Sequence, residues 1–278
     1  MINFIRSLPH FKGKFRLLRF IIKKQIRAYK DIIVYGKNNV VYKLPNLKEN
    51  LAFEIYADGI YERETIETII KYLPQDGIFL DIGANIGSIC IPVSKLRPDV
   101  TAICVEASPK VFEYLEYNVK LNKLNNCVLI NKLISDKDDE LCDFFSPTEL
   151  FGKGSSNPSF TNESEIIKSI TIDTLLKKVS NSIVNFIKID IEGFECFAFN
   201  GAEKTLTNKN APSILFEFLD SAEKEVHGIK VGDAQKILVK HNYNIFKIKK
   251  NKSLEKLNAI LLKGETQMLA TKFSDERK

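Results

Sequence analysis

A glycine turn between an apolar strand and a helix constrains this chain more than any other feature. Residues 79–87 read Phe-Leu-Asp-Ile-Gly-Ala-Asn-Ile-Gly, so the strand ends in Asp81 and Gly83-x-x-x-Gly87 leads into the helix. Glycine is favoured where a backbone turns sharply or approaches a ligand closely. Ligands of open α/β sheets bind at the carboxyl ends of the strands, above such turns. The turn therefore predicts a doubly wound α/β fold with a ligand site beside it.

Strands and helices alternate on both sides of this turn. Before the glycine turn, strands are predicted at 32–35, 40–42 and 52–56. From the turn on, strands are predicted at 78–81, 102–106, 128–130, 185–190, 213–217, 243–248 and 258–262. Helices are predicted at 65–73, 87–96, 109–122, 195–205 and 232–241. This order is typical of a mostly parallel sheet with helices on both faces. Because only a short polar link joins the last two strands, we expect them to form an antiparallel pair. Residues 140–174 are polar and irregular, and the segment 152–159 is the most loop-like part of the chain, suited to closing over a ligand.

The length of 278 residues suits one large α/β domain with an appendage. We expect a helical arm over residues 1–30, a cap of short strands and a helix over 31–75, a catalytic domain over 76–265 and a C-terminal tail over 266–278.

Residues 1–30 carry nine basic side chains and no acidic one. Their apolar residues recur every three or four positions, which predicts an amphipathic helix interrupted near Pro9 and Gly13. No apolar run reaches the roughly 20 residues that span a bilayer. Two interpretations stay open for this arm: peripheral contact with an anionic membrane, or packing of the apolar stripe on the domain.

Outside the arm, the chain has 35 acidic and 32 basic side chains. This near-neutral body argues against nucleic acid as a partner. Five cysteines, with no CxxC pair among them, favour free thiols in a reducing cytoplasm over a disulfide framework, and neither a zinc site nor another metal site is expected. The location expected is the cytoplasm, with the inner face of the membrane as the place of any peripheral contact.

Acidic residues also end two further strands. Glu106 closes the strand after the glycine turn, 25 residues beyond Asp81, near the spacing at which an acid holds ribose hydroxyls. The predicted strand 185–190 brings Lys188, Asp190 and Glu192 to the same edge of the sheet. The three side chains lie on one side if the strand stays extended. An acid at position 81 disfavours a pyrophosphate and favours a cationic ligand such as the amino group of a methionyl moiety.

These two segments, Asp81–Gly87 and Lys188–Glu195, resemble the FkbM family of methyltransferases. Similar stretches are Gly59-Ile-Tyr-Glu62, Thr171–Leu176, Asn200–Ala202 and Ile214–Glu217, so the resemblance covers roughly residues 55–220. It implies a Rossmann-like class I methyltransferase fold, S-adenosyl-L-methionine (SAM) as cofactor, and O-methylation of a hydroxyl on a sugar, glycan, glycolipid or natural product, as in polysaccharide biosynthesis. By position it places Asp81, Gly83, Asn85 and Gly87 at the methionyl end of SAM, Glu106 on the ribose, and Ser135 and Asp136 at the adenine.

A hydroxyl acceptor needs a proton acceptor as well as alignment with the methyl group. The candidates for this base are Asp190 and Glu192, then Glu217 at the next strand end and His227 in a nearby loop. Two alternatives compete with methyl transfer. One is an NAD-dependent oxidoreductase, which the glycine spacing disfavours. The other is a membrane-associated scaffold without turnover, which the acids Asp81, Glu106, Asp190 and Glu192 disfavour.

Overall fold

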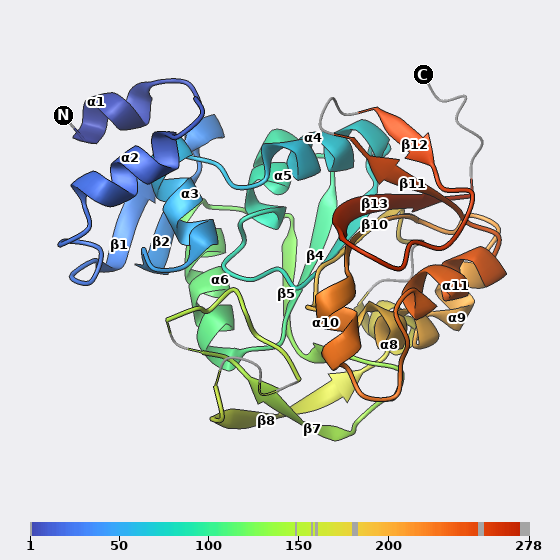
Figure 1. Cartoon of the computed structure of the whole chain (residues 1–278). Helices are drawn as coiled ribbons and strands as arrows, with labels where there is room; N and C mark the ends of the chain where they lie inside the picture. Colours follow the sequence, from blue (N-terminus) through green and yellow to red (C-terminus); the bar gives the residue numbers. More distant parts are fainter. Residues whose placement is uncertain are drawn as a thin grey trace.

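A computed structural model of the chain describes residues 2–147, 149–156, 158, 161–179, 183–249 and 253–272 (Figure 1). Its central sheet runs in the order β12-β11-β13-β10-β9-β3-β4-β5. The strands are β3 (Ile78–Ile82), β4 (Thr101–Glu106), β5 (Cys127–Asn131), β9 (Phe186–Ile189), β10 (Ser213–Leu219), β11 (Asn244–Ile248), β12 (Leu254–Lys256) and β13 (Glu265–Thr271). Strands β5, β4, β3, β9 and β10 are mutually parallel, whereas β13 is antiparallel to β10 and β11.

Alternating residues of the parallel strands face two separate hydrophobic cores, as expected for strands buried on both faces. On one face, Phe79 and Phe186 pack with the helices α4 (Arg63–Tyr72), α5 (Cys90–Leu96) and α6 (Pro109–Leu121). On the other, Leu80 and Ile187 pack with α7 (Ile172–Val179), α8 (Glu195–Asn200), α9 (Glu203–Thr207) and α11 (Asp233–Lys240). The doubly wound, mostly parallel fold and the antiparallel strands at its C-terminal end are thereby confirmed.

A smaller sheet of β6 (Leu133–Ile134), β8 (Ser164–Ile170) and β7 (Leu141–Phe145) lies beside the central one (Figure 1). It falls largely within the polar stretch 140–174, for which no regular structure was predicted. Apolar residues do not alternate regularly along β7 and β8, and Leu141 and Ile166 are exposed, so no clear strand period marks them. A short helix, α10 (Asp220–Glu225), was also missed.

Two predicted strands are wrong. Residues 52–56 belong to a helix, α3 (Asn50–Asp58), in which Phe53, Ile55 and Tyr56 are all buried. A helix buried on most of its sides shows no period that distinguishes it from a strand. Residues 258–262 form no strand, because the side-chain amide of Gln235 both donates to the Leu261 carbonyl and accepts from its N–H, each at 2.9 Å, in place of a neighbouring strand.

The predicted helix 195–205 is broken in two at Gly201. A side chain there would come within 2.3 Å of the Ser135 carbonyl oxygen. The helix therefore ends where β6 and its following turn approach the backbone, and α9 starts after this contact.

The N-terminal arm consists of α1 (Ile2–Ser7) and α2 (Lys14–Ile21), which lie at one end of the molecule beside α3 (Figure 1). A hairpin of β1 (Lys30–Tyr35) and β2 (Val41–Asn46), with the turn η1 (Lys37–Asn39), follows. Leu18 and Ile22 are fully buried in the same core as Phe53, and Lys14 is buried with its ammonium 2.7 Å from Asp58. The inner face of the arm therefore packs on the domain.

The outer face of the arm stays exposed. Phe20 is 79% exposed and Phe4 67% exposed, and the cations Arg16, Lys23 and Lys24 are exposed as well. Within the described ranges no helix is long and apolar enough to cross a bilayer.

Two adjacent leucines of α2 test whether the arm is part of the folded core. Leu18→Ala removes a fully buried side chain and is expected to lower the free energy of unfolding by about 2–5 kcal/mol. Leu17→Ala, at a position 42% exposed, should change it by under about 1 kcal/mol. Urea unfolding of both variants gives the comparison, and equal effects would show that the arm is not packed.

Candidate active site

The glycine turn lies where the strand order reverses direction, between β3 and β9. Asp81 pairs in register with Lys188 there, and Ile82 with Ile189. Gly83 has a φ of 75°, and a side chain on it would come within 2.0 Å of the Asp190 carbonyl oxygen. Only glycine therefore lets the two strand ends approach so closely, and this crevice is the usual ligand site of such sheets.

A buried ammonium group lies beneath this turn. The Lys188 Nζ is 3.3 Å from an Asp190 carboxylate oxygen, 3.7 Å from one of Asp81, and 3.3 Å from the Gly83 carbonyl oxygen, to which it donates. Burial opposes the charged form of Lys188, but the surrounding carboxylates of Asp190, Asp81 and Glu62 outweigh burial and hold its pKa above the ordinary value. In the described part of the chain, neither Asp81 oxygen has a hydrogen-bond partner. The charge of Lys188 is thus the main compensation for burying Asp81.

The Glu106 carboxylate joins two ligand-facing loops. One oxygen accepts the N–H of Asn85 at 2.9 Å, and the other accepts the N–H of Ser108 at 2.8 Å. Asn85 has a φ of 52°, which Asn tolerates better than most residues. Burial raises the pKa of Glu106 to about 7 despite these two N–H donors.

An inner cavity of about 350 Å³ opens above these residues. Its lining includes eight acidic side chains and three lysines: Glu49, Glu54, Glu62, Glu106, Asp190, Glu192, Glu217, Glu265, Lys132, Lys153 and Lys188. Two of the lysines are neutralised, because Lys153 lies 2.8 Å from Glu192 and Lys188 is bound by aspartates. The excess of carboxylates favours a cationic ligand.

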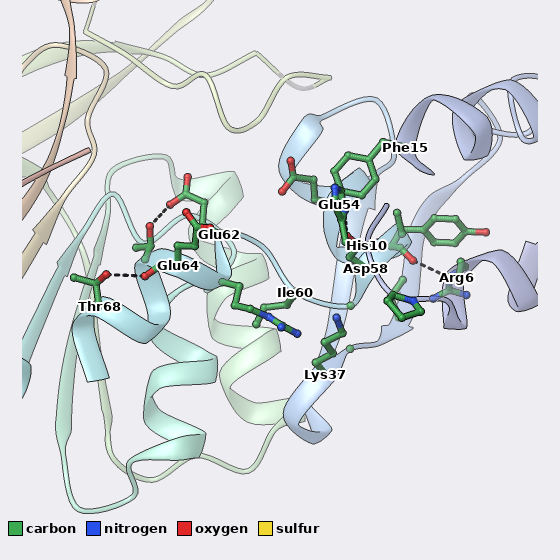
Figure 2. A pocket seen from close by; sticks show the side chains of 18 of the residues that line it. Arg6, His10, Phe15, Lys37, Glu54, Asp58, Ile60, Glu62, Glu64 and Thr68 are labelled. Atoms are coloured by element: carbon green, nitrogen blue, oxygen red, sulfur yellow. Dashed lines mark hydrogen bonds and ion pairs between the residues drawn. The ribbon is translucent and has the colours of Figure 1, made fainter. Parts of the chain in front are cut away.

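A larger outer cleft of about 1830 Å³ adjoins the inner cavity. Four acidic residues line both: Glu54, Glu62, Glu217 and Glu265. Figure 2 shows the outer cleft, with Glu62 and Glu64 on one side, His10 and Asp58 on the other, and Lys37 between them. The shared acids mark the junction at which a ligand in one space can react with a ligand in the other.

Three carboxyls at this junction have raised pKa values, and burial raises the pKa of Glu54 to about 7. Burial, and next the charges of Asp190 and Glu192, raise the pKa of Glu217 to about 8. Burial and Asp190 also raise the pKa of Glu62, whose carboxylate accepts the Thr65 hydroxyl at 2.9 Å. Glu62 sits at a φ of 40°, an uncommon backbone conformation for a residue other than glycine. Carboxyls whose pKa lies near neutrality are suited to proton transfer.

The structure gathers six of the predicted site residues around the inner cavity: Gly83, Asn85, Glu106, Asp190, Glu192 and Glu217. It places five elsewhere. Asp81 is fully buried beneath Lys188, Gly87 packs against Ile91 of α5, Ser135 and Asp136 lie against Gly201, and His227 is exposed on a turn after α10. The lining near Ser135 consists instead of Lys132, Leu133 and Ile134.

Several lining residues had no predicted role. Glu62 ends the Gly-Ile-Tyr-Glu segment, a family-like motif that carried no assigned chemistry. Lys153 lies in the loop expected to close over a ligand, and its ion pair with Glu192 now fastens that loop to the strand end. Glu54 lies in α3, and Glu49 is the residue before it. Neither was predicted at the site, because this helix was predicted to be a strand. Across the described residues, no group of three or more His, Cys, Asp or Glu side chains is arranged to hold a metal ion.

The fold and the acid-lined crevice define a class I methyltransferase architecture. The chain matches the family described as "Methyltransferase FkbM domain" over residues 81–245, more than half of its length. It therefore belongs to the FkbM methyltransferase family and is a methyltransferase of the SAM-dependent type.

Curated relatives match over shorter stretches. The chain is 36% identical over 115 residues to a tRNA(Phe) (4-demethylwyosine(37)-C(7)) aminocarboxypropyltransferase of Methanocaldococcus jannaschii, covering 40% of this chain and 44% of that protein. It is 25% identical over 150 residues to the hexuronic acid methyltransferase AglP of Haloferax volcanii, covering 54% and 59%. The chain thus spans about half the length of these relatives. Among solved structures, M. jannaschii TYW2 in complex with AdoMet aligns at 17% identity with a TM-score of 0.42, covering 87% of this chain and 85% of that one.

The residues of the inner cavity fit SAM. Its sulfonium and amino groups are cations, and the lining carries more carboxylates than free ammonium groups. Gly83 and Asn85 line this cavity, and Glu106 presents acceptor oxygens at the strand end where ribose hydroxyls bind in related sheets.

Binding of this cation should release protons. Without ligand, Glu106 and Glu217 have a pKa of about 7 and about 8, so both are partly protonated at pH 7.5. A nearby positive charge favours their ionised forms. SAM affinity should therefore fall as the pH drops below about 8, where Glu217 becomes protonated, and further below about 7, where Glu106 does, by up to about tenfold per unit for each proton. Calorimetry at pH 7.5 in phosphate and in Tris should give different apparent enthalpies. Identical enthalpies in the two buffers, with an affinity independent of pH, would contradict this coupling.

Proposed function

We propose that this protein transfers the methyl group of SAM to a hydroxyl of a sugar, a glycan or a glycolipid, with a carboxylate as the proton acceptor. The observation that carries the proposal is the junction of the two cavities, where Glu62 and Glu217 face both spaces. A hydroxyl must lose its proton during the transfer, and this junction supplies carboxyls with raised pKa values at that point. The sugar acid named in the description of AglP agrees with an acceptor of this class.

The candidate bases differ in what surrounds them. Asp190 is bound by Lys188 at 3.3 Å and Glu192 by Lys153 at 2.8 Å, and an ion pair makes a carboxylate a weaker base. Neither Glu217 nor Glu62 has an ion-pair partner within the described residues. We therefore propose Glu217 as the base, Glu62 as its neighbour on the acceptor, and Asp190 and Glu192 as positioning residues.

Bound SAM would supply an activated methyl group and a positive charge. That charge favours the ionised form of Glu217, so the base becomes active when the cofactor is in place. Gly83, Asn85 and Glu106 would hold the methionyl and ribose portions, and the Lys153–Glu192 ion pair would keep the loop closed and exclude water.

Amide substitutions at the junction test the base. Glu217→Gln should lower kcat at least about 100-fold and leave the SAM dissociation constant within a few-fold, because loss of a general base affects the transfer step. Glu265→Gln, which removes a carboxylate from the same junction, is the matched control and should retain activity.

The acceptor class is tested by mass spectrometry after incubation with isotopically labelled SAM. A surface-glycan extract, a neutral sugar pool and a tRNA pool form the three arms. Label on a sugar hydroxyl supports the proposal. Label on tRNA alone, or wild-type activity of Glu217→Gln, would refute it.

We further propose that the outer face of the arm contacts an anionic membrane from the cytoplasmic side. Phe4 and Phe20 are exposed beside cations that meet no acidic side chain of the arm. Phe4→Ser/Phe20→Ser should reduce co-sedimentation with phosphatidylserine vesicles more than about tenfold. Ile166→Ser, which removes a 71% exposed apolar residue from β8, is the control. Equal binding by both variants would disprove the contact.

A further inference from the structure

The outer cleft is built almost entirely from parts of the chain outside the family match. Of the residues that line it, Glu217 alone lies within residues 81–245. The arm contributes residues 6–10 and Phe15, and the hairpin and the segment from α3 to α4 contribute most of the rest. The matched domain thus supplies most of the inner cavity, while residues outside the match line most of the outer cleft.

Most cations that line the outer cleft are already engaged. Arg6 donates to the Tyr56 carbonyl oxygen at 2.6 Å and lies 4.3 Å from the centre of the Tyr56 ring. His10 is 2.7 Å from Asp58, and Lys249 is 3.2 Å from Glu255. These three side chains have little remaining capacity to hold a ligand.

Lys37 and Arg63 are different. Both line the cleft and are exposed, and neither side chain makes a hydrogen bond or ion pair with any residue in the described ranges. Both belong to the lining of one cleft, where partial burial and then the charge of Arg63 lower the pKa of Lys37, while the charge of Asp58 opposes this shift. Two like charges that repel across a cleft are stabilised when an anion lies between them.

The backbone fixes this pair. The Lys37 N–H donates to the Gly59 carbonyl oxygen at 2.6 Å, and a side chain at Gly36 would come within 2.5 Å of the same oxygen. The turn after β1 is therefore held against the segment that leads into α4. Arg63 is the first residue of α4 and directly follows Glu62 at the junction. The cation pair accordingly lies next to the proposed transfer point.

We propose that Lys37 and Arg63 form a binding site for a negatively charged group of the acceptor, a sugar carboxylate or phosphate, while the acceptor hydroxyl faces Glu62 and Glu217. The outer cleft would then hold the acceptor's anionic group at Lys37 and Arg63, with Glu62 and Glu217 at its junction with the inner cavity. An acceptor that carries an anionic group near its hydroxyl would be oriented by two contacts, the anionic group at the cations and the hydroxyl at the carboxylates. This inference rests on the proposed function for the methyl transfer itself, but the anion site can be measured without it.

Calorimetry with defined probes tests the site directly. The full chain, with and without S-adenosylhomocysteine, is titrated with glucuronate, glucose 1-phosphate and glucose. Saturable binding of at least one anionic probe, with glucose at least about tenfold weaker, is the expected result. Preference for glucuronate or for glucose 1-phosphate distinguishes a carboxylate from a phosphate.

The variant Lys37→Gln/Arg63→Gln should weaken binding of the anionic probe at least about tenfold and leave binding of S-adenosylhomocysteine unchanged. Lys177→Gln/Lys209→Gln, which removes two exposed lysines remote from the cleft lining, is the matched control and should bind like the wild type. Equal binding of glucose and the anions, no saturable binding of either anion, or an unaffected double variant would each overturn the anion site.

Methyl transfer provides the separate readout. A glycan extract divided by anion exchange should be labelled in its anionic fraction, and the Lys37→Gln/Arg63→Gln variant should raise KM more than it lowers kcat. Label confined to the neutral fraction would overturn the anion site but leave the proposed function standing. Anion binding without methyl transfer to any hydroxyl would support the anion site and overturn the proposed function.

Discussion

The buried charge of Lys188 is the interaction on which the site depends. It lies at the point where the strand order reverses and holds the ends of β3 and β9 together through Asp81 and Asp190. Breaking a buried ion pair by removing one partner typically costs about 3–5 kcal/mol, because the remaining charge is left without compensation. Burial raises the pKa of Asp81, and the charge of Lys188 is the largest effect that opposes this shift. The family motif thus contains a structural pair as well as ligand-facing residues.

The molecule divides its tasks between the shared domain and the added N-terminal part. Residues 81–245 supply the glycine turn, Glu106 and the acids of β9 and β10, which together form a cavity suited to a cationic cofactor. The arm, hairpin and α3 supply the opposite wall and the outer cleft. Because Leu18 and Ile22 share a core with α3, this wall is a packed part of the fold. The walls of the outer cleft and the hydrophobic core therefore belong to the same packed unit.

The sequence predicted β3, β4, β5, β9, β10 and β11 because these strands are largely apolar. It missed β12 and β13, and β13 lies mostly in the segment predicted as a C-terminal tail. Glu106 could be placed from its spacing to Asp81, whereas Gly83 and Asn85 were assigned to the ligand through the family resemblance. Asp81 was expected at the ligand and lies under Lys188, because alternation along a strand does not show which of two paired charges faces the cavity. Glu49, Glu54 and Glu62 reach the site only through the packing of α3 and α4, which no local pattern encodes.

Three residues around the cavity have backbones in the left-handed region without being glycine: Glu62 at φ 40°, Asn85 at 52° and Glu192 at 54°. Such conformations cost on the order of 1 kcal/mol or more each and persist where the surroundings impose them. Glycine at positions 62 and 192 would relax the main chain and at the same time delete the carboxylates that the site needs. At these two positions the residue that would best suit the backbone lacks the carboxylate, so the acidic side chains are present only at the cost of a strained main chain.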